Sequence, residues 1–233
     1  MKKIILFSLW FCSWLICHGQ ACSNAYRIVI LGSSTAYGTG ANPISDSSWV
    51  ARYTRYLKSI NPAYTVVNLA EGGYDTYQIQ ADGYLPPKGR KLPDTSRNIS
   101  KALSLDPDAI IINLPSNDAA ENLTQQEQKA NFERVARLAD KSHVPLWVTT
   151  TQPRNLSGTK LHKLVQMRDW IYSFFGKKSI DFWTGLAQAS GTQIKEYGAG
   201  DGIHLNNAGH RILYLRVVSA DIPDSLCARN NPR

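Results

Sequence analysis

Residues 27–35, Arg-Ile-Val-Ile-Leu-Gly-Ser-Ser-Thr, decide the fold of this chain. The run from Arg27 to Leu31, which is rich in β-branched side chains, is typical of a strand. Gly32 permits a sharp turn after the strand, because glycine accepts backbone angles that other residues avoid. Ser33 and Ser34 follow on that turn. We therefore expect the first strand of a parallel sheet, with a serine at its carboxyl end.

The rest of the chain repeats this pattern, because short apolar runs alternate with longer amphipathic stretches. Such alternation is typical of βαβ units. The expected strands are 27–31, 64–69, 109–114, 145–150 and 179–182, the expected helices are 49–60, 96–105, 124–141, 161–175 and 207–218, and residues 83–94 are expected to form a proline-rich loop. The pattern predicts a three-layer α/β/α sandwich with a flavodoxin-like, five-stranded parallel sheet. In such a sheet the carboxyl ends of all strands share one edge, where active sites gather.

The first residues have the pattern of an export signal. Two lysines precede an apolar run over residues 4–17, and small residues follow at Gly19 and Ala21. We expect a signal peptide over residues 1–21, a single domain over residues 22–233, and an exported protein, periplasmic or extracellular. An uncleaved N-terminal anchor is the alternative. No stable membrane insertion is expected after cleavage, because the apolar run is shorter than the roughly 20 residues that a bilayer requires.

The charge of the chain gives no indication of a nucleic-acid partner. The 233 residues carry a formal charge of +8, and removal of residues 1–21, with two lysines and no acidic residue, lowers it to +6. The basic residues are scattered rather than gathered on one helix face, as a nucleic-acid site would require. The tightest cluster, Lys88, Arg90 and Lys91, is interpreted as part of a solvated loop.

Two cysteines remain outside the expected signal peptide. Cys22 and Cys227 stand at opposite ends of the mature chain. The first strand begins at the edge opposite its serine, and the last helix runs back toward that edge, so we expect a Cys22–Cys227 disulfide. Lipid anchoring at Cys17 or Cys22 is not favoured, because neither has a leucine three positions earlier. The Cys and His spacings of zinc sites are absent from the sequence.

The segment 201–210, Asp-Gly-Ile-His-Leu-Asn-Asn-Ala-Gly-His, carries a candidate acid–base pair. Asp201 and His204 stand three residues apart in a turn before a helix. A carboxylate there can orient the imidazole and leave its other nitrogen for a serine hydroxyl. Two simpler interpretations are an aspartate cap beside a surface histidine, and a metal pair with His210. The second lacks a third ligand at suitable spacing.

Two further loops after strands offer hydrogen-bond donors. Residues 68–74, Asn-Leu-Ala-Glu-Gly-Gly-Tyr, present backbone N–H groups, and residues 115–118, Pro-Ser-Asn-Asp, present the side-chain amide of Asn117. Each loop alone also fits a turn or a helix cap. Together with Ser34 and His204, they bring a nucleophile, a base and two donors to one edge of one sheet.

On these residues the sequence resembles the SGNH hydrolase superfamily over essentially all of residues 22–233. That family places Ser, Gly, Asn and His in four blocks in this order. Segments 32–34, 68–73, 115–118 and 201–210 match the four blocks in turn. Ser33 stands where many members have aspartate, so it remains an alternative nucleophile to Ser34.

The resemblance implies a role for each site residue. Ser34 is the nucleophile, His204 is the general base, and Asp201 orients His204. The oxyanion hole consists of the backbone N–H groups of Ser34 and Gly73 and the side chain of Asn117. No metal and no organic cofactor are implied.

The resemblance also implies the reaction, which is hydrolysis of a small-molecule or glycan ester. We expect small acyl groups, O-acetyl above all, on a carbohydrate. Aromatic residues near the strand ends would stack on sugar rings, or simply pack in the core. They are Tyr37, Trp49, Tyr74, Tyr77 and Trp183. The alternatives are a lipid or thioester acylhydrolase, an acyltransferase, and a non-catalytic glycan-binding module on the same fold.

Overall fold

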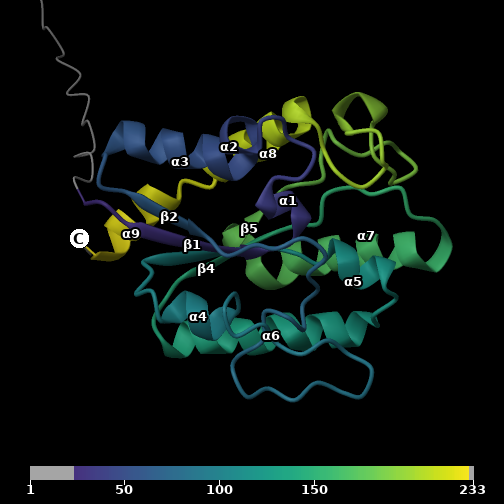
Figure 1. Cartoon of the computed structure of the whole chain (residues 1–233), viewed down its shortest axis with the longest axis horizontal. Coiled ribbons are helices and arrows are strands. Elements are labelled where there is room, and N and C mark those ends of the chain that lie inside the picture. The colour runs from purple at the N-terminus through teal and green to yellow at the C-terminus, as the bar shows by residue number, and fades with distance from the viewer. Residues whose placement is uncertain (1–23, 231–233) are drawn as a thin grey trace, which may run out of the picture.

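The computed structural model describes residues 24–230, and a five-stranded parallel sheet forms its centre (Figure 1). The strands are β1 (Arg27–Gly32), β2 (Thr65–Asn68), β3 (Ala109–Asn113), β4 (Leu146–Thr149) and β5 (Ser179–Ile180). Their order across the sheet is β2-β1-β3-β4-β5, and every neighbouring pair is parallel. This is the flavodoxin-like order that the sequence pattern predicts.

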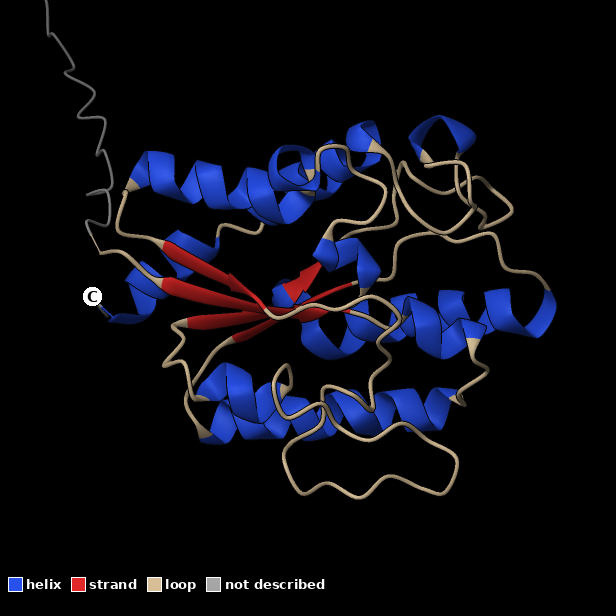
Figure 2. Ribbon diagram, viewed as in Figure 1, coloured by secondary structure: helices blue, strands red, loops and turns tan. Residues whose placement is uncertain are grey.

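Helices cover both faces of the sheet, as Figure 2 shows. They are α1 (Ser34–Tyr37), α2 (Ile44–Ser47), α3 (Trp49–Ile60), α4 (Ile99–Leu103), α5 (Ser116–Ala120), α6 (Gln125–Lys141), α7 (Gly158–Phe175), α8 (Asn207–Ser219) and α9 (Ile222–Asn230), with short 3-10 turns at Gly176–Lys178 and Lys195–Tyr197. The core on one face gathers residues of α3, α8 and α9, and the core on the other gathers residues of α4, α6 and α7. The three-layer sandwich is therefore confirmed.

The strands are almost continuously apolar because both faces are buried. Ile28 and Ile30 of β1 belong to the core beneath α3 and α8, while Val29 and Leu31 belong to the core beneath α6 and α7. All five residues of β3 are buried as well. Burial of one such side chain contributes about 1.5–3 kcal/mol, so this central part of the sheet is a rigid base for the loops that leave it.

The elements differ from the expected ones mainly at their ends. Helix α6 begins after Thr124 with the expected capping box, in which the Thr124 hydroxyl and Glu127 carboxylate exchange hydrogen bonds with each other's backbone. In contrast, α4 is shorter than the expected 96–105, and β5 is shorter than the expected 179–182. The short helices α1, α2 and α5 are too brief to show a periodicity in the sequence.

The expected last helix, 207–218, is followed by a second one, α9, which lies near the beginning of β1 (Figure 1). Cys227 of α9 is disulfide-bonded. Cys22 lies outside the described residues, as does the expected signal peptide, so the Cys22–Cys227 pairing stays a prediction. Within residues 24–230, no helix is both long enough and apolar enough to cross a bilayer.

Candidate active site

The nucleophile candidate lies directly after β1, at the carboxyl edge of the sheet. Ser34 is the first residue of α1, and its Oγ lies 2.9 Å from Nε2 of His204. Ser33 Oγ makes a different contact, because it accepts a hydrogen bond of 2.8 Å from the side-chain amide of Asn117. The two serines therefore point to different partners, and only Ser34 makes a hydrogen bond to the His204 ring.

Asp201 completes a hydrogen-bonded series with His204. Asp201 Oδ2 lies 2.6 Å from His204 Nδ1, and Oδ1 accepts from the backbone N–H groups of Ile203 and His204 at 2.8 Å each. Burial alone would raise the pKa of Asp201, but these hydrogen bonds lower it to about 2. The carboxylate is therefore ionised at neutral pH, and it holds the imidazole with Nε2 directed at Ser34.

The turn that carries His204 is held in place by the segment that follows α1. The segment after α1 passes so close that a Cβ on Gly40 would lie 2.2 Å from the Leu205 carbonyl oxygen and 3.1 Å from His204 Cβ. The same segment is joined to α8 by paired hydrogen bonds of 2.7 Å between the Asn42 backbone and the Asn207 side chain. Only a glycine at position 40 permits this close approach.

His210 has a structural role in this packing. Its ring is fully buried, Nδ1 accepts from the Trp49 backbone N–H at 3.3 Å, and Nε2 lies 3.1 Å from the Thr39 carbonyl oxygen. Burial lowers the pKa of His210 to about 4. Both ring nitrogens are thus engaged, so a metal pair with His204 does not form. In residues 24–230, no cluster of three or more potential metal ligands is present.

The two donor loops lie beside Ser34. Among the described residues, the backbone N–H groups of Ser34 and Gly73 donate to no acceptor. Asn117, in α5, donates from Nδ2 to Ser33 Oγ at 2.8 Å and to the Tyr74 carbonyl oxygen at 2.9 Å. The structure therefore brings all the sequence-predicted site residues to one sheet edge, with the Asn117 amide engaged by its neighbours.

Arg154 is a site residue that the sequence analysis missed. It follows β4, and its Nη1 donates to Asn117 Oδ1 at 2.9 Å. This bond fixes the orientation of the amide, since the oxygen faces Arg154 and the nitrogen faces the nucleophile segment. Arg154 is the single charged residue of residues 150–157. Because β4 ends at the same edge of the sheet as β1, a lone charged residue in the loop after β4 could have indicated a site residue from the sequence.

A buried polar network ties the two donor loops together. Asp118 is fully buried and accepts from the Thr76 backbone N–H at 3.1 Å and from the Thr76 hydroxyl. Asn131 of α6 donates to Thr76 Oγ1 at 2.8 Å. Burial, assisted by the nearby charge of Asp75, raises the pKa of Asp118 well above its usual range. These bonds hold residues 73–76 against α5.

Lys91 binds the loop after β2 that contains Gly73. Its Nζ lies 2.7 Å from Glu121 Oε1 and 3.4 Å from Asp75 Oδ2, and it donates to the Gly73 carbonyl oxygen at 3.2 Å. Arg90 forms a separate ion pair of 2.7 Å with Glu127. The basic cluster therefore lies in a largely exposed loop, as expected, and its Arg90 and Lys91 also form ion pairs.

The candidate sugar-stacking residues are mostly part of the core. Trp49 is 0% exposed, Tyr77 2%, Tyr74 6% and Trp183 8%, whereas Tyr37 is 46% exposed. Trp49 packs edge-on against Phe182 beneath α3. Of these five aromatic residues, Tyr37 at the end of α1 is the one that is exposed.

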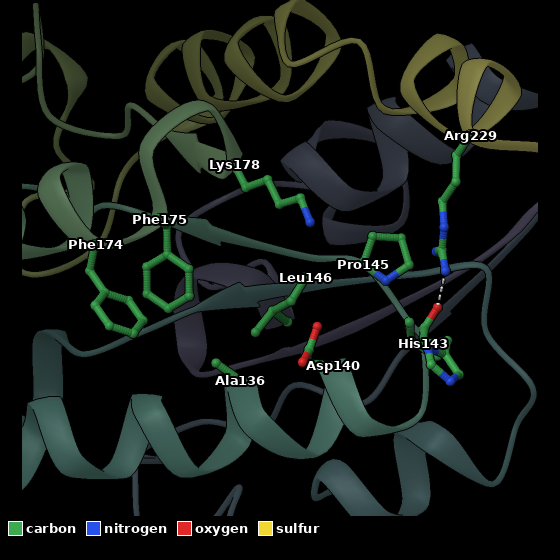
Figure 3. A pocket seen from close by; sticks show the side chains of 10 residues that line it. Ala136, Asp140, His143, Pro145, Leu146, Phe174, Phe175, Lys178 and Arg229 are labelled. Atoms are coloured by element: carbon green, nitrogen blue, oxygen red, sulfur yellow. Dashed lines mark hydrogen bonds between the residues drawn. The ribbon is translucent and has the colours of Figure 1, made fainter. Parts of the chain in front are cut away.

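A cavity of about 550 Å³, drawn in Figure 3, lies where the chain enters β4. The site around Ser34 lies at the carboxyl ends of the strands, which is the other edge of the sheet. Its walls come from the ends of α6 and α7, the segment that enters β4, and α9. The lining side chains include Asp140, Pro145, Phe174, Lys178 and Arg229. At the site around Ser34, the Asp201 side chain is 45% exposed and that of His204 is 16% exposed.

Comparison with known proteins gives a family match for most of the chain. Residues 30–212 match the GDSL-like lipase/acylhydrolase family. No match was found among curated proteins.

Solved structures share the fold. An acetylxylan esterase from Geobacillus stearothermophilus matches with a TM-score of 0.64 at 14% identity, over 86% of this chain and 96% of that one. A GDSL-like lipase from Bacteroides thetaiotaomicron matches at 0.62 and 16%, over 84% and 87% of the two chains. A lipase/acylhydrolase from Enterococcus faecalis matches at 0.61 and 19%, over 86% and 96%. With the family match over residues 30–212, the chain belongs to the GDSL-like lipase/acylhydrolase family and is a serine hydrolase that acts on ester bonds.

Proposed function

We propose that this enzyme is an exported esterase that removes small acyl groups, acetyl above all, from hydroxylated substrates such as carbohydrates. The observation that carries the proposal is the hydrogen-bonded series from Ser34 through His204 to Asp201. A hydroxyl, an imidazole and an ionised carboxylate in this sequence of contacts form the arrangement that activates a serine for attack on a carbonyl.

In the acylation step, Ser34 Oγ forms a bond to the ester carbonyl carbon while His204 Nε2 takes the hydroxyl proton. The bond between that carbon and the alcohol oxygen then breaks, and His204 gives its proton to the departing alcohol. In the second step, a water molecule attacks the acyl-serine and passes a proton to His204. The bond to Ser34 Oγ breaks, Oγ recovers the proton, and the acid leaves.

The negative charge on the carbonyl oxygen requires donors at each step. The N–H groups of Ser34 and Gly73 are available for this role, since neither has an acceptor in the described part of the chain. Asn117 supplies the third donor by exchanging its bond to Ser33 Oγ for one to the oxyanion. Loss of one such donor typically lowers turnover 100- to 1000-fold.

The character of the edge supports a small acyl group and a polar alcohol. Gly73 and Asp201 are exposed, and Tyr37, the last residue of α1, is 46% exposed. Three cavities, of about 550, 440 and 210 Å³, are lined by residues of α6, α7, α9 and the beginning of β4 rather than by the catalytic residues. An open polar edge suits a hydrated substrate better than a long acyl chain, which gains from an apolar channel.

The test is hydrolysis of p-nitrophenyl esters from C2 to C16, of thioesters, and of acetylated polysaccharides with acetate release as the readout. We expect the highest kcat/KM at C2, and a loss of about a thousandfold or more in Ser34→Ala and in His204→Ala, with little further loss in the double variant. Ser33→Ala is the matched control and should keep near wild-type turnover. Circular dichroism checks the fold of each variant.

Each alternative function has its own outcome in that experiment. A preference for C16 or for thioesters would favour a lipid or thioester acylhydrolase. Acylated product in place of free acid, when an acceptor sugar is supplied, would favour an acyltransferase. Binding of glycan without any hydrolysis would favour a non-catalytic module and would refute the proposal.

The N-terminal sequence supports the exported location. Two lysines, an apolar run and small residues succeed one another within residues 1–21. Expression of the full chain followed by N-terminal sequencing of the exported protein is expected to give a start at or near Cys22. Retention of Met1 on an exported or membrane-bound product would contradict cleavage.

A further inference from the structure

The loop after β4 places a cation with spare donors beside the nucleophile segment. Arg154 is partly buried, and its Nη1 donates to Asn117 Oδ1 at 2.9 Å. Within residues 24–230 this is the one hydrogen bond that its guanidinium makes, and the guanidinium forms no ion pair there. A guanidinium carries five N–H donors in a planar fork, so most of the donors of Arg154 are left without an acceptor.

The guanidinium stands between two catalytic segments. The backbone N–H of the next residue, Asn155, donates to the Gly202 carbonyl oxygen at 2.8 Å, which joins this loop to the turn that carries Asp201. On the other side, the amide that Arg154 holds lies 2.8 Å from Ser33 Oγ. Arg154 is thus two hydrogen bonds away from the residue that precedes the nucleophile.

The carboxylates that act on Arg154 already have partners of their own. Burial lowers the pKa of Arg154, while the charges of Asp201 and Glu121 raise it. Asp201 binds the His204 ring at 2.6 Å, and Glu121 binds Lys91 at 2.7 Å. Arginine keeps its charge in proteins, so a partly desolvated charge remains at the site without a counterion in the described part of the chain.

We propose that Arg154 forms an anion-binding subsite, and that the esters which this enzyme hydrolyses best carry a carboxylate close to the ester bond. The substrate class is an acylated hydroxy acid, acidic sugars included. The inference rests on the proposed function, because it takes Ser34 as the group that attacks the ester. The planar fork of a guanidinium matches the two oxygens of a carboxylate, and partial burial strengthens that pair.

The test compares esters that differ only in charge. The acetyl esters of 2-, 3- and 4-hydroxybutanoate are each paired with the corresponding amide, and kcat/KM is measured for both members at low salt. We expect the carboxylate to be preferred by about 10- to 100-fold in at least one pair, mainly through KM, as a charged hydrogen bond predicts.

Two variants separate this role from the support that Arg154 gives to Asn117. Arg154→Gln keeps an N–H that can reach Asn117 Oδ1, whereas Arg154→Met does not. Hydrolysis of the neutral amide-bearing esters should therefore fall less in Arg154→Gln than in Arg154→Met. The preference for the carboxylate should disappear in both. Arg137→Gln, at an exposed position on α6, is the matched control and should keep the preference.

The outcomes distinguish the two proposals. If p-nitrophenyl acetate and all of the paired esters resist hydrolysis by the folded enzyme, the proposed function fails. If p-nitrophenyl acetate is hydrolysed but no carboxylate ester is preferred over its amide, or the preference survives in Arg154→Gln, the subsite is refuted and the proposed function stands.

Discussion

Lowering the pH from 7 to 5 is expected to reduce the free energy of unfolding by about 2 kcal/mol through one side chain, His210. The ring is fully buried between α8 and the start of α3. Its Nδ1 accepts a hydrogen bond from the Trp49 backbone N–H, so this nitrogen has no room for a proton in the folded chain. Burial accordingly lowers the pKa of His210 from 6.5 to about 4.

The sign of the effect follows from the two pKa values. Between pH 6.5 and pH 4, the unfolded chain binds a proton at His210 that the folded chain does not bind. Stability therefore has its full value above pH 6.5 and falls as the pH drops through that value toward 4. The whole shift corresponds to about 3 kcal/mol, of which about 2 kcal/mol is lost by pH 5.

Urea unfolding at pH 7 and pH 5, in the wild type and in His210→Gln, measures this contribution. Glutamine can still donate to the Thr39 carbonyl oxygen but does not titrate. The variant should be less stable at pH 7, yet its loss between pH 7 and pH 5 should be smaller than the wild-type loss by about 2 kcal/mol. His162→Gln on the exposed face of α7 is the control and should keep the wild-type difference. An unchanged pH dependence in His210→Gln would refute the reasoning.

Three further substitutions test other features of the structure. Gly40→Ala should lower stability in thermal melts by about 1–3 kcal/mol and should reduce kcat, because the added Cβ would lie 2.2 Å from the Leu205 carbonyl oxygen. The control Gly89→Ala also has a positive φ but no such contact, so its loss of stability should be smaller. Asn117→Ala should lower kcat on p-nitrophenyl acetate 100- to 1000-fold while circular dichroism shows a folded chain, and full activity would exclude Asn117 from the oxyanion hole. Thr124→Ala should cost about 1 kcal/mol in urea unfolding with kcat unchanged, since it removes only the cap of α6.

The sheet and the Asp201–His204 pair were predictable because their signals are local, whereas Gly73 and Asn117 were assigned on the resemblance to a known family. The run from Ile28 to Leu31 is buried on both faces, which requires apolar residues at every position. Asp201 and His204 stand three residues apart on one turn, so a contact between them was expected, and the structure contains it at 2.6 Å. Residues whose roles depend on neighbours along the chain can be found in the sequence.

The features that escaped prediction depend on distant contacts. Arg154 acts on Asn117, which is 37 positions away, and nothing near Arg154 in the sequence indicates that partner. Lys91 lies 30 positions from Glu121, with which it pairs. Trp49 and Tyr77 were candidates for substrate contact, but both fill the core, because aromatic residues beside strand ends also close the ends of the sheet.

The separation of Ser34 and His204 in the sequence has a consequence for how activity appears during synthesis and folding of the chain. Their side chains meet across 170 positions of sequence, so the nucleophile emerges early in synthesis and its base emerges near the end. Contacts between such distant residues close late in folding, since a long loop must first be ordered. A chain that ends before residue 204 lacks the base for Ser34, so it cannot hydrolyse esters by this mechanism. In refolding from denaturant, the helical circular dichroism signal should return before esterase activity. The return of activity would then report that α8 and α9 have packed onto the sheet.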